Sequence, residues 1–249
     1  MGRCGYEDGQ RLMRWMHLQL RAPMASFGGE IVDAHGVIRD MPAQSMLTGL
    51  LANALGWDRS MRTEHQALQD RIVFGAVWER DIGLSRMVDY QTAQLGKNDR
   101  SWTTRGVPAG RDGGAATYVG AHQRWREYHA DLRLSVVVRL EPAETSPTLN
   151  ALHAALDRPA RPLFIGRKCC LPSSPIFGGW VEATTAREAL GAIAPSGAAG
   201  LFASWPAAEG TDGSNRITSV TDERNWVSGL HGGGREVCEG SITSSRGES

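Results

Sequence analysis

The run Leu132-Arg133-Leu134-Ser135-Val136-Val137-Val138-Arg139-Leu140 carries the clearest structural signal in the sequence. Every second side chain of the run is apolar, and a β-strand places alternate side chains on one face. We therefore expect a strand whose apolar face is turned toward the core. Apolar residues at helical spacing over 148–157 and a short apolar run over 162–165 follow it, and these predict a helix and a further strand.

The same alternation of strand and helix occurs upstream. Residues 14–21 alternate, which predicts a strand with an apolar face and a polar face exposed to solvent. Helical spacing predicts a helix over 42–55, and residues 71–79 have the composition of another strand. The order strand, helix, strand, excursion, strand, helix, strand is a split βαβ arrangement. We therefore expect an α+β protein built on a ferredoxin-like (RRM-related) domain.

Changes in composition suggest three segments of chain. We expect an N-terminal extension over 1–12, the ferredoxin-like domain over 13–175, and a small C-terminal β-rich module over 176–249. The module contains strand-like pieces at 216–220 and 235–238. Residues 81–120 of the domain are rich in glycine and lack an apolar period, and such long irregular stretches are often functional. We predict a long thumb-like insertion there, over about 84–111.

The charge is balanced overall but unevenly distributed. The 27 basic and 27 acidic residues give a net charge of zero, so no global field attracts nucleic acid. All basic residues except Lys97 and Lys168 are arginine, whose planar group binds phosphate and stacks on bases. A GC-rich genome would also favour arginine. Basic residues concentrate between positions 95 and 126 and between 158 and 168, which predicts local anion-binding sites.

The sequence lacks the motifs that are typical of several classes of protein. No apolar run approaches the roughly 20 residues that span a bilayer, so no membrane segment is expected. Walker, HExxH and paired CxxC motifs are absent, and we expect no cofactor and no metal. The four cysteines fit neither a disulfide framework nor zinc spacing, which indicates a reduced, cytoplasmic protein. In an extended chain, Cys169 and Cys170 would not direct both thiols at one metal.

Three places in the chain have residues suited to an anionic or single-stranded ligand. The polar face of the first predicted strand ends in Arg21, and the start of the first helix, near Gln44 and Ser45, offers free amide groups to a phosphate. Gly166 ends a predicted strand and would let the backbone approach a ligand, with two cations directly after it. A solvent-exposed face, an ordinary helix start and a solvated turn are the simpler explanations of the same residues.

Six segments match the sequence motifs of a known family, in the same order along the chain. They are residues 20–28 (LRAPMASFG), 41–45 (MPAQS), 89–92 (DYQT), 126–128 (REY), 163–170 (LFIGRKCC) and 222–226 (DERNW). Together they resemble the CasD family of CRISPR-associated proteins, the RAMP-type subunit of type I-E Cascade. The resemblance covers about residues 14–240. The sequence has Gln91 where the family usually has His, and Gln44 where it has Arg or Lys.

The resemblance implies a non-catalytic subunit of a multisubunit antiviral complex. Such a subunit grips the 5′ handle of the crRNA, contacts the Cascade backbone subunits and the large PAM-reading subunit, and lies near target DNA. The RNA-binding residues that we expect are Arg21, Gln44, Ser45, Lys97, Arg105, Arg111, Arg124, Trp125, Arg126, Gly166, Arg167 and Lys168.

Two other functions stay open at this point. A metal-independent endoribonuclease that cuts CRISPR repeat RNA would use a general base and an oxyanion stabiliser, drawn from His122, Tyr128, His129 and Lys97. A protein–protein adaptor without RNA contact would use residues 176–249 to dock a neighbouring subunit.

Overall fold

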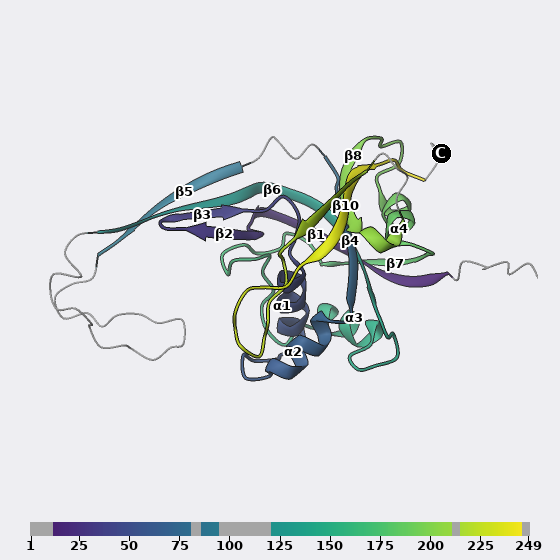
Figure 1. The fold of residues 1–249 in the computed structure, drawn as a ribbon, viewed down its shortest axis with the longest axis horizontal. Coiled ribbons are helices and arrows are strands. Elements are labelled where there is room, and N and C mark those ends of the chain that lie inside the picture. Colours follow the sequence, from purple (N-terminus) through teal and green to yellow (C-terminus); the bar gives the residue numbers. More distant parts are fainter. Residues whose placement is uncertain (1–11, 81–85, 95–120, 211–214, 246–249) are drawn as a thin grey trace, which may run out of the picture.

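The computed structural model describes residues 12–80, 86–94, 121–210 and 215–245 (Figure 1). The predicted N-terminal extension, apart from Leu12, and much of the predicted thumb therefore lie outside the described residues. The architecture is mixed α/β, with one curved sheet that joins all ten described strands. None of the described helices combines the length and the apolar character needed to cross a membrane.

Four antiparallel strands form the centre of the sheet. β1 (Met13–Ala25) pairs with β6 (His122–Leu140) from Met16↔Val138 to Ala25↔His129. β4 (Ile72–Trp78) pairs with the other side of β6, and β7 (Phe177–Ala183) pairs with β1. The order across the sheet is therefore β4-β6-β1-β7. The strands predicted at 14–21, 71–79 and 132–140 are confirmed within these elements.

The strand predicted over 162–165 is wrong, and β7 occupies the place expected for it. Proline at position 162 has no N–H to donate to a strand ladder. The backbone of Ile165 instead bonds to Cys170 O (2.7 Å) and to Ser26 N (3.2 Å), so the segment forms a turn beside β1. β7 lies after residue 175, so the sheet continues across the domain boundary that the sequence predicts there.

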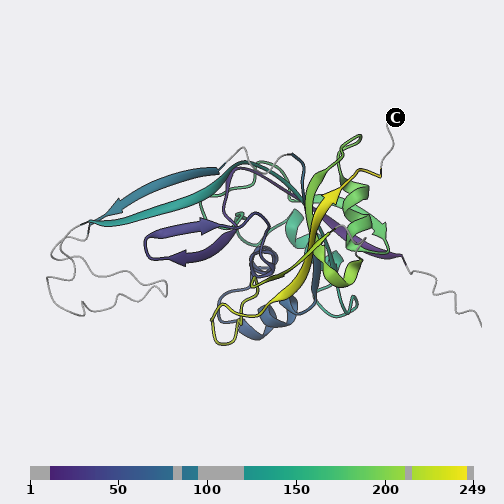
Figure 2. The same ribbon diagram turned by 45° about the horizontal axis from the view of Figure 1, so that its top comes forward.

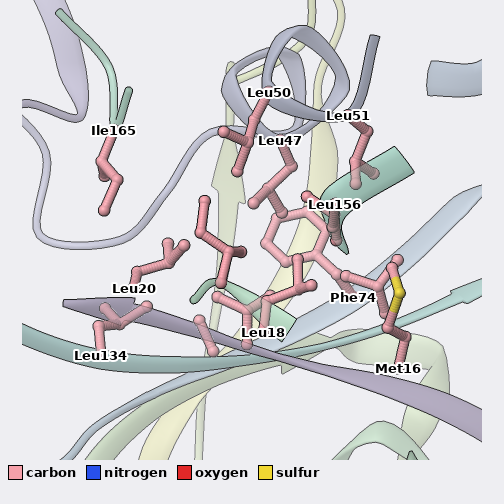
Figure 3. Close-up of a cluster of buried hydrophobic side chains, with 14 of the residues drawn as sticks. Met16, Leu18, Leu20, Leu47, Leu50, Leu51, Phe74, Leu134, Leu156 and Ile165 are labelled. Carbon is pink, nitrogen blue, oxygen red and sulfur yellow. The ribbon is translucent and has the colours of Figure 1, made fainter. Parts of the chain in front are cut away.

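Three helices cover one face of the sheet, as Figures 1 and 2 show. α1 (Gln44–Ala54) and α3 (Leu149–Asp157) lie where helices are predicted, and α2 (Arg62–Gln69) follows α1. Leu18 of β1, Leu47 of α1 and Leu134 of β6 are fully buried between them (Figure 3). The apolar positions of the sequence thus form the main core, because alternate strand residues and one helix stripe meet there.

The opposite face of β1 is also buried, which corrects the expectation of a solvent-exposed polar face. Trp15 is 0% exposed and His17 is 9% exposed. α4 (Ala186–Ile193) and β8 (Leu201–Pro206) contribute to a second apolar cluster around Trp15. The polar atoms have partners there, since Trp15 Nε1 donates to Ala183 O at 3.2 Å and His17 Nε2 bonds to Ser135 Oγ at 2.8 Å.

A long arm extends from the body of the protein. β5 (Arg86–Ala93) pairs with the first half of β6, and this pair projects outward in Figure 1. A hairpin of β2 (Gly28–Val32) and β3 (His35–Ile38) lies beside it, with β3 parallel to β6. Most β5 side chains are exposed, so the strand needs no apolar period. For that reason the sequence pattern indicated only an irregular segment there.

The C-terminal strands extend the sheet beyond β4. β8 pairs with β4 and with β10 (Arg235–Ile242), and β10 pairs with β9 (Arg216–Val220). The strands predicted at 216–220 and 235–238 are confirmed. α4 and β8 were not predicted. For α4 the reason is that small residues dominate 183–200, so the short helix shows no clear apolar spacing. The side chain of Thr185 caps α4 by accepting a hydrogen bond from Glu188 N at 3.2 Å.

Candidate nucleic-acid interface

A cleft of about 750 Å³ opens where the arm joins the body. The β2–β3 hairpin, the start of α1, the turn at 166–167 and the segment 221–231 form its walls. Four of the predicted RNA-binding residues line it: Ser45, Arg126, Gly166 and Arg167. These residues come from three places that are distant in the sequence: the start of α1, strand β6 and the turn at 166–167. The fold brings these three places together.

Arg126 extends from β6 into this cleft. Its Nε–H donates to Gln91 Oε1 on β5 at 3.1 Å, which fixes the direction of the side chain. Among the described residues, Arg126 has no salt bridge, and its two terminal nitrogens have no hydrogen-bond partner. The guanidinium therefore retains a positive charge and donors that can bind an anionic group.

Arg167 has a different role, because its guanidinium is bound to the protein. It donates to Glu127 O of β6 at 3.0 Å and to Gly36 O of β3 at 3.5 Å. The group also lies 4.6 Å from the centre of the Tyr128 ring, at cation–π distance. Arg167 thus joins the hairpin to β6 and stiffens the wall of the cleft.

Gly166 allows two backbone segments to approach each other, whereas the sequence suggested that it admits a ligand. Its φ angle is +88°, and a Cβ atom at this position would lie 1.8 Å from Ser26 O. Only glycine fits this conformation and this contact. The residue therefore positions the turn against the loop after β1.

The amide groups at the start of α1 are not free, which corrects the predicted phosphate site. Gln44 N donates to Asp222 Oδ2 and Ser45 N donates to Asp222 O, both at 3.1 Å. The Gln44 side chain is buried and donates to Gln69 O at 2.7 Å. Ser45 faces the cleft, but the helix terminus itself is already capped by the protein.

The segment 221–231 supplies cleft residues that the sequence did not assign. Arg39 donates to Thr221 O at 2.8 Å, which holds the segment against the β2–β3 hairpin. Arg224 lines the cleft, and burial lowers the pKa of its guanidinium. Burial, and then the negative charge of Asp222, raises the pKa of Glu223 in the same wall. The 222–226 motif marks this segment in the sequence, but only the fold shows that it covers α1.

Trp125 lies on the opposite face of the arm from Arg126, because neighbouring strand residues point in opposite directions. It forms a row of rings across three strands. Its ring stacks on His35 of β3, with centres 4.8 Å apart and planes 7° apart, and Tyr90 of β5 lies 5.1 Å away. Trp125 therefore does not line the cleft, and its ring contacts hold β3, β6 and β5 together.

The other predicted residues are dispersed. Arg21 is bound to Glu79 at 3.0 Å, Arg124 is exposed farther out along β6, and Lys168 is exposed just after the turn. Lys97, Arg105 and Arg111 lie outside the described residues.

The candidates for RNA cleavage do not converge in the described structure. His122 and His129 are seven residues apart on β6, about 23 Å along an extended strand. His129 is buried, its Nε2 donates to Arg39 O at 2.8 Å, and burial lowers its pKa. Burial raises the pKa of Tyr128, and Lys97 lies outside the described residues. Within the described chain, no three or more His, Cys, Asp and Glu side chains are grouped to hold a metal.

The chain shares its fold with CRISPR-associated proteins. A solved structure described as a CRISPR RNA-guided surveillance complex matches with a TM-score of 0.64 and 21% identity, covering 94% of this chain and 93% of the other. A second, described as a Cas protein, matches with a TM-score of 0.59 and 23% identity, covering 94% of this chain and 98% of the other.

Sequence comparison makes the assignment specific. The family model described as CRISPR-associated protein (Cas_Cas5) matches residues 15–238. The CRISPR system Cascade subunit CasD of Escherichia coli (strain K12) is 26% identical over 182 residues, which cover 71% of this chain and 75% of the relative. The chain therefore belongs to the Cas5 family of CRISPR-associated proteins, which confirms the resemblance found in the sequence.

Proposed function

We propose that this chain is a non-catalytic subunit of a type I-E CRISPR surveillance complex and that its cleft binds the 5′ handle of the crRNA. The family supports a place in such a complex, since the E. coli relative is named a Cascade subunit. The observation that carries the RNA-binding part is Arg126, which lines a cleft and has no carboxylate partner among the described residues.

Single-stranded RNA suits this surface. Its phosphates and unstacked bases are accessible to arginine and hydroxyl side chains along a groove. Arg126 offers charged donors, Ser45 offers a hydroxyl group, and Arg167 holds the β2–β3 hairpin against β6 next to Arg126. A chain of zero net charge can still bind RNA when several subunits share the same strand, because linked sites add to one another's affinity.

The proposal extends to the architecture and the partners. The order β4-β6-β1-β7, with α1 and α3 as crossovers, supports a ferredoxin-like domain. The β5–β6 arm corresponds to the thumb of that domain. We place backbone subunits and the large PAM-reading subunit next to this chain in the cytoplasm, with target DNA nearby. We also propose that the part of the chain after β7, which contains α4, β8, β9 and β10, docks the large subunit.

The test compares two arginine variants in the assembled complex. The tagged chain is co-expressed with its neighbouring subunits and a CRISPR array, and the RNA that co-purifies is quantified and sequenced. We expect Arg126→Ala to lose about tenfold in RNA affinity, which corresponds to one charged hydrogen bond. Arg158→Ala removes the same charge at the exposed end of α3 and should have no effect. Equal RNA retention by the two variants, or handle cleavage by the purified chain in chelator, would contradict the proposal.

A further inference from the structure

Two adjacent cysteines, Cys169 and Cys170, lie in the turn formed by residues 165–170. Cys169 Sγ and Cys170 Sγ lie 4.0 Å apart, whereas the sequence suggested that an extended chain would not direct both thiols at one metal. The chain is not extended here, because Cys170 N donates to Arg167 O at 2.8 Å and Ile165 N donates to Cys170 O at 2.7 Å. These bonds fold residues 165–170 into a tight turn.

The two thiols have different surroundings. Cys169 is exposed, and its sulfur lies 3.8 Å from the hydroxyl oxygen of Tyr128. Cys170 is fully buried, and burial, together with the negative charge of Cys169, raises the pKa of its thiol to about 11. Since the thiolate is the nucleophile, Cys169 is the sulfur that reacts first with a reagent from solution.

We infer that Cys169 and Cys170 form a modification site that reacts with a low-molecular-weight disulfide of the glutathione class and becomes a vicinal disulfide. The Cys169 thiolate attacks one sulfur of the reagent, the reagent's S–S bond breaks, and one reagent thiolate leaves. The Cys170 thiol then loses its proton and attacks Cys169 Sγ, which expels the reagent's remaining half as a second thiolate. The two protons lost by the cysteines complete two reagent thiols, and the protein dithiol is oxidised by two electrons.

The mixed-disulfide intermediate favours the second step. Once Cys169 carries the reagent it has no negative charge, so one of the causes of the raised Cys170 pKa disappears. The two sulfurs are adjacent in the chain and already within 4.0 Å, so ring closure needs no movement of a distant segment. Arg167, in the same turn, adds a positive charge that lowers the Cys170 pKa.

The product is strained, which makes the modification reversible. A disulfide needs an S–S distance of about 2.05 Å, and its Cα atoms are usually 4.4–6.8 Å apart. Adjacent residues across a trans peptide have Cα atoms only about 3.8 Å apart, so the backbone must distort. Strained and accessible disulfides are the readily reduced ones. The distortion falls on the hydrogen bonds of Cys170, and the same turn carries two cleft residues, Gly166 and Arg167.

The test measures the mass and location of the modification. Reduced full-length protein, freed of reductant, is incubated with oxidised glutathione and analysed by intact mass and peptide mapping. We expect a loss of two hydrogen atoms, a link within the peptide that contains residues 169–170, and full reversal by dithiothreitol. Amide hydrogen exchange across 165–170 should be faster in the oxidised form, because its turn hydrogen bonds are weakened.

Three variants make the result specific. Cys170→Ser should stop at the mixed disulfide with glutathione on Cys169, whereas Cys169→Ser, which alters only an exposed position, should form neither product. Cys238→Ser should behave like the unaltered protein. The inference fails if the unaltered protein stays reduced, stops at the mixed disulfide, or links either cysteine to Cys4, Cys238 or a second chain.

Discussion

The carboxylate of Asp222 accepts a hydrogen bond from the backbone N–H of Gln44 at 3.1 Å, so a residue 178 positions away caps α1. The helix needs this partner because Ala43, at its N-cap position, has no side chain able to accept. Asp222 is also paired with Arg235 of β10 at 3.0 Å. One buried carboxylate thereby joins the 221–231 wall of the cleft to both α1 and the C-terminal strands.

Asp222→Ala should therefore destabilise the whole chain. It removes a helix cap, worth about 1 kcal/mol, and leaves the partly buried Arg235 without its counter-charge. We expect the free energy of unfolding in urea to fall by about 3 kcal/mol, and less for Asp222→Asn, which keeps an acceptor. Asp157→Ala, at an exposed position of α3, is the matched control. Equal stability of Asp222→Ala and Asp157→Ala would show that the cap does not matter.

Gly166→Ala tests the close contact between the turn and the loop after β1. The new Cβ would lie 1.8 Å from Ser26 O at a φ of +88°, so the backbone must move. A strained left-handed residue costs about 1–3 kcal/mol before this clash is added. We expect a loss of more than about 3 kcal/mol in urea unfolding. Gly28→Ala, whose Cβ would meet nothing within 4 Å, should change stability little; similar losses in both variants would refute the explanation.

Burial of His129 should make stability depend on pH. Desolvation lowers its pKa below the ordinary 6.5, although the carboxylates of Asp40 and Glu127 act in the opposite direction. Below pH 6.5 the unfolded chain binds a proton that the folded chain does not, so stability falls as the pH decreases. The slope is at most about 1.4 kcal/mol per pH unit.

His129→Gln keeps a donor for Arg39 O and removes this titration. Urea unfolding at pH 7.5 and pH 5.5 should show that the unaltered protein loses more stability than the variant, by at most about 1.4 kcal/mol. His122→Gln, at an exposed position, should keep the full pH dependence. A variant His129→Gln with the same pH dependence as the unaltered protein would assign the effect to other groups.

The sequence predicted what local patterns determine and missed what distant contacts determine. Alternation and helical spacing located β1, α1, α3 and the second half of β6, because burial imposes a period on those residues. β4 is buried on both faces and was located by its composition. β5 has no buried face and therefore no period. In the candidate site, Arg126 was predicted from the sequence and does line the cleft. The hydrogen bonds from Gln44 N to Asp222 and from Arg167 to Glu127 O were not predicted, because they join segments that are distant in the sequence.

Arg126 and Trp125 are adjacent on β6 but point to opposite faces of the arm. Arg126 brings a positive charge to the cleft, whereas Trp125 packs against neighbouring rings. Each phosphate contact contributes about 0.7 to the slope of log affinity against log salt for a single strand. We expect Arg126→Ala to lower this slope by about 0.7 in fluorescence anisotropy with labelled repeat RNA, without changing the stability of the chain. Trp125→Ala removes ring contacts with His35 and Tyr90 and should cost about 2 kcal/mol of stability. Its salt slope should stay unchanged, because the indole carries no charge and points away from the cleft. A reduced slope in Trp125→Ala with an unchanged slope in Arg126→Ala would place the RNA on the other face of the arm.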